Sequence, residues 1–182
     1  DEMSFQQGHA LVIGVGSHQY EPRLNVPITV VDAQAVAGVL CDQAFCGYPQ
    51  DQVSILHDET ATTERILDSL EQLAGNMGEE DTFFFFYSGH GEYGADGNYY
   101  LVSHDARISH RKVVTGSGVS QGELLKVVAR VPARRVLMVF NACHSGEISP
   151  TLGVEDDLGA KNLPSTAASA LLSTGSGRII IT

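Results

Sequence analysis

Two side chains that can do nucleophilic chemistry stand at the ends of apolar runs. The segment 82–91 reads TFFFFYSGHG and contains His90, and the segment 135–146 reads RVLMVFNACHSG and contains Cys143. A thiolate attacks a carbonyl carbon far better than a thiol does, so a catalytic cysteine needs a base, and histidine is the usual base near neutral pH. The pattern predicts a nucleophile, Cys143, with His90 as its base.

Small residues surround both side chains, which favours a catalytic over a structural interpretation. Gly89 and Gly91 leave the backbone beside His90 open to a substrate, and Ala142 does the same beside the sulfur of Cys143. Attack on a carbonyl creates an oxyanion that backbone N–H groups can stabilise. We expect the N–H groups of Gly91 and Cys143 to be those donors.

The other histidines and cysteines are expected to be ordinary core or surface residues. A lone histidine is usually structural, and a lone cysteine is usually a small buried apolar residue. The spacing of Cys41 and Cys46 is not that of a zinc site, so we assign no metal ligand and expect both to be small buried apolar residues. The histidines in this group are His9, His18, His57, His104, His110 and His144.

The elements that must position the two motifs alternate between strand and helix patterns. Strands are predicted at 10–15, 53–56, 81–87, 99–102, 136–140 and 178–182, and helices at 30–41, 63–74, 123–130 and 166–172. Strands that are apolar on both faces and separated by helices predict a mainly parallel sheet with helices on both faces. Such a sheet places its sites at the carboxyl ends of its strands, where both motifs fall.

Composition limits the function classes. The 182 residues suit a single domain, 1–182, with 43% hydrophobic and 18% charged residues. The net charge of -11 argues against a nucleic-acid partner and favours a cationic one. No apolar run approaches the ~18 residues of a membrane span. Three sparse cysteines fit a reducing compartment, so we expect a cytoplasmic protein.

The two motifs resemble the signatures of a known family. YSGHG at 87–91 and ACHSG at 142–146 resemble those of caspase-like cysteine peptidases, closest to metacaspases and bacterial orthocaspases. The separation of 143 − 90 = 53 residues agrees with a caspase histidine lying ~50 residues before its cysteine. VIGVGSHQY at 12–20 extends the resemblance. It implies a caspase–haemoglobinase fold, a three-layer α/β sandwich, with His90 as base and Cys143 as nucleophile.

The resemblance also implies a substrate class. Metacaspases cleave after Arg or Lys, using two acidic residues in the S1 pocket. Asp32 matches the first, whereas Asn141 stands where the family carries the second. A single carboxylate still favours a basic side chain, by ~1.5–3 kcal/mol for a charge-assisted hydrogen bond. We therefore expect protein or peptide substrates cleaved after Arg, and less well after Lys.

The sequence ends on the strand pattern 178–182, which resembles a large-subunit portion without its small-subunit elements. We expect a C-terminal segment to complete the sheet. Self-processing at a basic residue is a further expectation, and the candidate positions are Lys161, Arg178, Arg107, Arg111 and Lys112.

The sequence requires no cofactor. Many metacaspases need calcium, which takes six to eight oxygen ligands, several of them carboxylates. The stretch after His90 offers Glu92, Asp96 and Asp105, which do not form a dense cluster, and the acidic run 155–157 is typical of a solvated loop.

Competing interpretations remain open. Gly14 and Gly16 after a strand suggest a dinucleotide site, but the third glycine of that fingerprint is replaced by Gln19. A partner-regulated peptidase of the CHAT or separase type would share the His and Cys motifs. A catalytically silent caspase-fold scaffold would keep the fold without the reaction. Capture of Cys143 by an arginyl electrophile would separate the peptidases from the scaffold.

Overall fold

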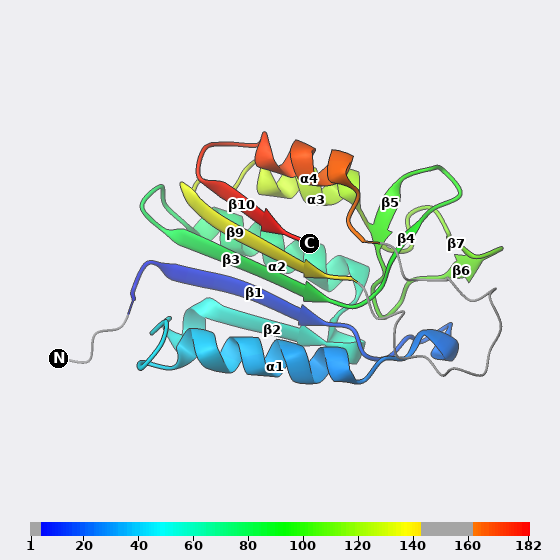
Figure 1. The fold of residues 1–182 in the computed structure, drawn as a ribbon, viewed down its shortest axis with the longest axis horizontal. Helices are drawn as coiled ribbons and strands as arrows, with labels where there is room; N and C mark the ends of the chain where they lie inside the picture. Colours follow the sequence, from blue (N-terminus) through cyan, green and yellow to red (C-terminus); the bar gives the residue numbers. More distant parts are fainter. Residues whose placement is uncertain (1–4, 143–161) are drawn as a thin grey trace.

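Five parallel strands form the central sheet. The computed structural model describes residues 5–142 and 162–182. The strands run in the order β10-β9-β3-β1-β2 (Figure 1), and all four pairings are parallel. Their bounds are β1 Gly8–Gly14, β2 Val53–His57, β3 Thr82–Ser88, β9 Arg135–Asn141 and β10 Arg178–Ile181. The predicted parallel sheet is confirmed.

Helices cover both faces of this sheet. The helices are α1 Ile28–Cys41, α2 Thr63–Asn76, α3 Gln121–Val128 and α4 Ser165–Leu172. On one face Val12 of β1 packs with Ala33 of α1, and on the other face the next residue, Ile13, packs with Ile66 of α2. Alternate side chains of a strand point to opposite faces, so one apolar strand supplies both cores. The α/β three-layer sandwich is confirmed (Figure 1).

Local signals set the helix starts. The Ser120 hydroxyl accepts from the Glu123 N–H and the Glu123 carboxylate accepts from the Ser120 N–H, and this capping box starts α3 at Gln121, two residues before its predicted start. Thr62 caps α2 at the predicted start of the helix, but α2 continues through Gly75 and Asn76, two residues past its predicted end. Gly75 does not take up a left-handed conformation there. None of the described helices is long and apolar enough to cross a membrane.

Short elements gather beyond the carboxyl ends of the central strands (Figure 1). They comprise the antiparallel strands β4 Gly91–Tyr93, β5 Tyr99–Leu101 and β8 Val119–Ser120, the hairpin of β6 Ile108–Ser109 and β7 Lys112–Val113, and the 3-10 helices η1 Pro22–Leu24 and η3 Asp58–Thr60. A further 3-10 helix, η2 Gln50–Gln52, lies at the opposite edge of the sheet, directly before β2. Leu24 of η1 packs with Tyr100 and Val102 in a third apolar cluster. This cluster fixes the segments that surround the end of β3.

Candidate active site

His90 lies between β3 and β4 and is only 2% exposed. Its Nε2 atom is 2.8 Å from the carbonyl oxygen of Leu24. A carbonyl can only accept, so Nε2 carries the proton and donates it. The His90 carbonyl accepts from the N–H of Val102 at 2.9 Å. Ring and backbone are therefore both held, and Nδ1 is the ring nitrogen that can take up a proton.

Tyr87 supports the same residue from inside the core. Its hydroxyl lies 2.6 Å from the His90 carbonyl oxygen and 3.0 Å from that of Val102. Burial raises the pKa of Tyr87 well above its ordinary value, so the phenol stays a neutral donor. A Cβ atom on Gly89 would lie 2.6 Å from the Tyr87 hydroxyl oxygen. Gly89 thus makes room for this support, in addition to opening the backbone.

Gly91 presents its N–H away from its partner strand. The Val102 N–H donates to the His90 carbonyl, and the following pair in the antiparallel register is Gly91 with Leu101. Hydrogen-bonded and non-hydrogen-bonded pairs alternate in an antiparallel ladder. Gly91 therefore holds a non-hydrogen-bonded position, and its N–H is directed away from β5. This orientation suits the predicted role of Gly91 as a donor to an oxyanion.

Asp32 and Asn141, predicted from the sequence to share the S1 pocket, lie together and meet a third residue, Ser88. The Ser88 hydroxyl is 3.4 Å from the Asp32 carboxylate, and the Asn141 amide nitrogen is 3.5 Å from that carboxylate and 3.3 Å from the Ser88 hydroxyl. Asp32 and Asn141 are half-buried and Ser88 is buried. The cluster joins α1, β3 and β9 at the carboxyl edge of the sheet.

Ser88 was missed by the sequence-based reasoning. A signal was present, because Ser88 precedes His90 by two residues as Asn141 precedes Cys143 by two.

Cys143, the predicted nucleophile and second oxyanion donor, lies outside the described residues. So do His144, Lys161 and the acidic run 155–157. The prediction that Cys41 and Cys46 are buried is wrong, because Cys41, at the end of α1, is half-buried and Cys46, in the turn after it, is exposed.

The acidic side chains that follow His90 serve separate local roles. Glu92 accepts from the N–H of Tyr93. Asp96 accepts from Asn98 and Tyr100, and these hydrogen bonds lower the pKa of its carboxyl. Asp105 accepts from the N–H of Thr63 and the hydroxyl of Ser103. Across 5–142 and 162–182, no three His, Cys, Asp or Glu side chains come together to hold a metal ion. The described carboxylates of 92–105 therefore do not converge on one point.

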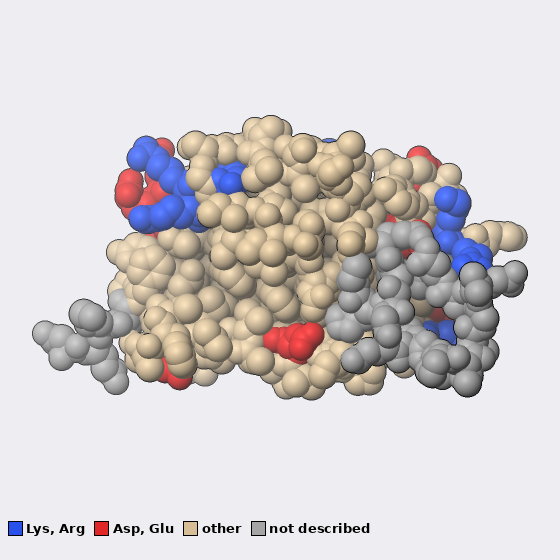
Figure 2. All heavy atoms as spheres, viewed as in Figure 1, with Lys and Arg blue, Asp and Glu red and all other residues tan. Residues whose placement is uncertain are grey.

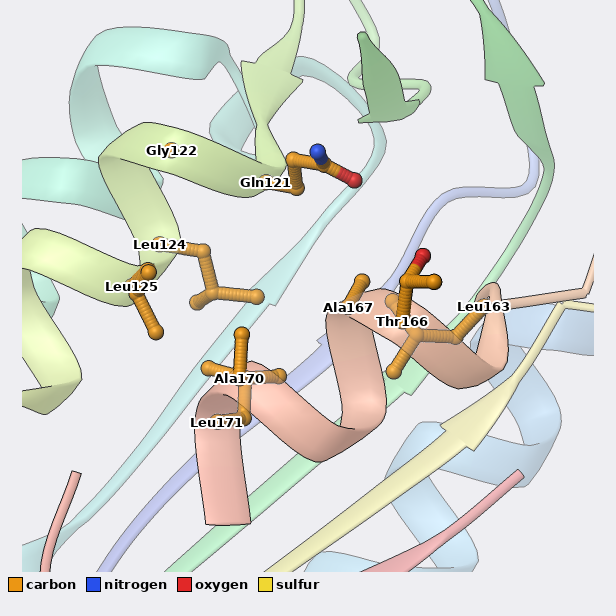
Figure 3. A pocket seen from close by; sticks show the side chains of 9 residues that line it. All are labelled: Gln121, Gly122, Leu124, Leu125, Leu163, Thr166, Ala167, Ala170 and Leu171. Atoms are coloured by element: carbon orange, nitrogen blue, oxygen red, sulfur yellow. The ribbon is translucent and has the colours of Figure 1, made fainter. Parts of the chain in front are cut away.

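A separate apolar crevice lies between α3 and α4 (Figure 3). It is lined by Gln121, Gly122, Leu124, Leu125, Leu163, Thr166, Ala167, Ala170 and Leu171. None of these side chains titrates, so the crevice offers no acid, base or charged ligand group. The candidate chemistry lies instead at the carboxyl edge of the sheet.

A parallel sheet between two helix layers, with a buried histidine following one central strand, defines an α/β protein of the caspase type. The chain belongs to the metacaspase family, because the profile of the metacaspase peptidase C14 domain matches residues 8–151. The family is that of caspase-like cysteine peptidases, as the two motifs indicated.

One solved structure shows the same fold. It is a protein from Geobacter sulfurreducens with a TM-score of 0.54 and 22% sequence identity, covering 76% of this chain and 51% of that protein's chain. This chain thus spans about half the length of that relative. Among curated proteins, none matches the chain at a significant level.

Proposed function

We propose that this chain is a cysteine endopeptidase with His90 as base and Cys143 as nucleophile. The register of the sheet is the observation that supports the dyad most strongly. Ser88 of β3 pairs with Asn141 of β9, an offset of 141 − 88 = 53 residues. The separation of His90 and Cys143 is also 143 − 90 = 53 residues. Asn141, two residues before Cys143, thus lies beside Ser88, two residues before His90, which supports a dyad at this edge of the sheet.

The proposed reaction begins with proton transfer from the Cys143 thiol to Nδ1 of His90, while the Leu24 carbonyl keeps Nε2–H in place. The thiolate attacks the scissile carbonyl carbon and forms a C–S bond, and the N–H groups of Gly91 and Cys143 stabilise the oxyanion. The C–N bond then breaks, and His90 gives its proton to the leaving amine. Water, deprotonated by His90, hydrolyses the acyl-enzyme and restores the thiol.

The proposed specificity is for a basic P1 side chain, Arg before Lys. The Asp32 carboxylate would face the guanidinium, and Ser88 and Asn141 would add neutral hydrogen-bonding groups. The surrounding charge supports this choice. Residues 24–64 contain six Asp or Glu and no Lys or Arg. Figure 2 accordingly shows acidic but no basic side chains over α1.

A panel of peptides that differ only at P1 tests the proposal. We expect turnover after Arg, slower turnover after Lys, and little after citrulline, which has the shape of Arg without its charge. His90→Ala and Cys143→Ala should each abolish turnover, whereas Cys46→Ala, at an exposed cysteine, should not. A preference for P1 Asp would contradict the basic S1 pocket.

Self-processing is proposed at an exposed basic residue. Arg111 and Lys112 lie in the exposed β6–β7 hairpin, whereas the half-buried Arg178 donates to the carbonyls of Val131 and Ala133. We expect fragments from the wild type that do not form from Cys143→Ala. In a separate measurement, we expect a calcium chelator to leave the turnover of peptide substrates unchanged. Fragments that persist in Cys143→Ala would exclude self-processing.

A further inference from the structure

A second buried histidine lies against the candidate base. The ring centroids of His18 and His90 are 5.6 Å apart, with the ring planes tilted by 37°. His18 is only 3% exposed. It comes from the loop between β1 and η1, far from His90 in the sequence. The fold therefore places an imidazole beside the candidate base in a site where burying a polar ring is costly.

His18 first fixes the loop that holds the His90 ring. Its backbone N–H donates to the side-chain oxygen of Asn25 at 2.8 Å. Asn25 directly follows Leu24, whose carbonyl accepts from Nε2 of His90. The loop from His18 to Asn25 is thereby closed on itself, with the Leu24 carbonyl at its inner end.

His18 also contacts the strand end that holds the His90 backbone. Its Nδ1 lies 3.3 Å from the carbonyl oxygen of Ser103, so Nδ1 carries the proton and donates it. Ser103 directly follows Val102, whose N–H donates to the His90 carbonyl. One residue thus joins the two segments that orient His90, through its backbone N–H on the Leu24 side and through its ring on the Ser103 side.

The ring of His18 is kept neutral. Burial, and then the nearby His90 ring, lower the pKa of His18 to about 4. His104 adds a smaller lowering effect, and the Ser103 carbonyl and Asp58 act in the opposite direction. With Nδ1 protonated, Nε2 is an acceptor, and it has no hydrogen-bond partner among residues 5–142 and 162–182. Buried polar atoms without a hydrogen-bond partner in the protein are uncommon.

We propose that His18 is a positioning residue that locks His90 in its Nε2–H tautomer, by joining the Leu24 loop to the Ser103 strand end. The catalytic consequence rests on the proposed function. The orientation itself does not, because it is a property of the folded protein. When a hydrogen bond holds Nε2, the ring presents Nδ1 in one direction. Small errors in the orientation of a catalytic group strongly reduce the rate of the chemical step.

Two variants of equal shape isolate the hydrogen bond. In His18→Asn the amide nitrogen takes the approximate place of Nδ1 and can still donate to the Ser103 carbonyl, whereas His18→Leu has no donor. Nitrogen NMR of the His90 ring reports its tautomer. We expect a single Nε2–H form in the wild type and in His18→Asn, and a mixture in His18→Leu. His110→Asn, in an exposed turn with positive φ that asparagine tolerates, is the matched control and should change nothing.

Turnover gives the second readout. We expect kcat on an Arg substrate to fall at least ~10-fold in His18→Leu with KM within ~2-fold, and to stay within ~3-fold of the wild type in His18→Asn. Wild-type tautomer and kcat in His18→Leu, or equal losses in both variants, would overturn the proposal. A wild type that cleaves no peptide would refute the proposed function and leave the NMR test intact.

A third variant covers the case in which His18→Leu does not fold. Asn25→Ala removes the acceptor for the His18 N–H at an exposed position where truncation leaves the core intact. We expect it to give a mixed His90 tautomer and a reduced kcat. A single Nε2–H tautomer in Asn25→Ala would overturn the proposal.

Discussion

A catalytic imidazole is useful only when the correct nitrogen is protonated. In His90 the Leu24 carbonyl decides this, because it accepts a hydrogen bond from Nε2 and cannot donate one. Nδ1 is then the atom that can receive the thiol proton. Tyr87 and Val102 hold the backbone of the same residue. In these contacts, every group that orients the proposed base is neutral.

Asp32 gives the sharpest prediction for specificity. Asp32→Asn should lower kcat/KM for an Arg substrate by ~10–100-fold, since a charge-assisted hydrogen bond contributes ~1.5–3 kcal/mol and each 1.4 kcal/mol is tenfold. Turnover of the citrulline peptide should change little. Asp68→Asn, at an exposed position of α2, is the matched control.

The reverse change tests the same pocket. Asn141→Asp restores the acidic residue that the family pattern carries at this position, and should increase the ratio of Arg to citrulline turnover. An Asp32→Asn variant that cleaves Arg and citrulline peptides in the wild-type ratio would exclude Asp32 from the pocket.

His18 makes the stability of the fold depend on pH. Its pKa falls from 6.5 to about 4 on folding, so between these values the unfolded chain binds a proton that the native protein does not. The free energy of unfolding should be unaffected by His18 above pH 6.5 and should decrease as the pH falls towards 4. The loss attributable to His18 is on the order of 3 kcal/mol, at 1.36 kcal/mol for each pKa unit.

Denaturant unfolding at a series of pH values measures this effect. Leucine at position 18 cannot take up a proton. The difference between the unfolding free energies of the wild type and His18→Leu at each pH therefore gives the contribution of His18, separated from the contributions of the carboxyl groups. The predicted wild-type decline between pH 6.5 and 4 is steeper than that of His18→Leu. Parallel curves would contradict it.

At the scale of elements, the turn from β3 to β4 depends on Gly89. A methyl group there would meet the Tyr87 hydroxyl at 2.6 Å, and Tyr87 is fully buried and cannot move aside. Gly89→Ala should therefore displace the Tyr87 support and reduce turnover by ~10-fold or more, with a loss of ~1–3 kcal/mol of stability as in overpacked cores.

A second glycine in open space gives the control. Gly38 lies within α1 with nothing near the place of its missing Cβ. Gly38→Ala should stabilise the protein by ~0.4–1 kcal/mol and leave turnover unchanged. Thermal unfolding and peptide hydrolysis measure both variants. Wild-type turnover in Gly89→Ala would show that Tyr87 does not support His90.

The elements that were predicted correctly are those whose sequence pattern lies within the element itself or directly beside it. The apolar runs of β1, β3 and β9 need no partner to be recognised, and the capping box of Ser120 and Glu123 spans four residues. The end of α2 was misplaced because Gly75 usually ends a helix, whereas here the helical hydrogen bond from the Met77 N–H to the Leu73 carbonyl continues past it.

Contacts between distant segments could not be predicted from the sequence. The clustering of Ser88 with Asp32 needs the packing of α1 on the end of β3, which no local pattern encodes. His18 looked like an ordinary histidine because its importance lies in touching His90, Asn25 and Ser103 together. The family resemblance supplied the pairing of Asp32 with Asn141, and the structure brings the two side chains together.

At the scale of the whole molecule, the strand order determines the site. Because β3 lies between β1 and β9, its carboxyl end is flanked by the loop after β1, which carries His18 and Leu24, and by the end of β9, which carries Asn141. The base, its supports and the proposed S1 cluster thus come from neighbouring strand ends. The net charge of -11 gives this arrangement an overall attraction for cationic substrates.

The central claim is that Cys143 is a nucleophile activated by His90 in a site that accepts arginine. Treatment of the native protein with a peptidyl-arginine chloromethyl ketone, followed by peptide mass spectrometry, tests it most directly. We predict one adduct, on Cys143, that forms far more slowly in His90→Ala and is displaced by excess Arg substrate. An adduct on Cys41 or Cys46 instead, or no adduct on the folded protein, would contradict the claim.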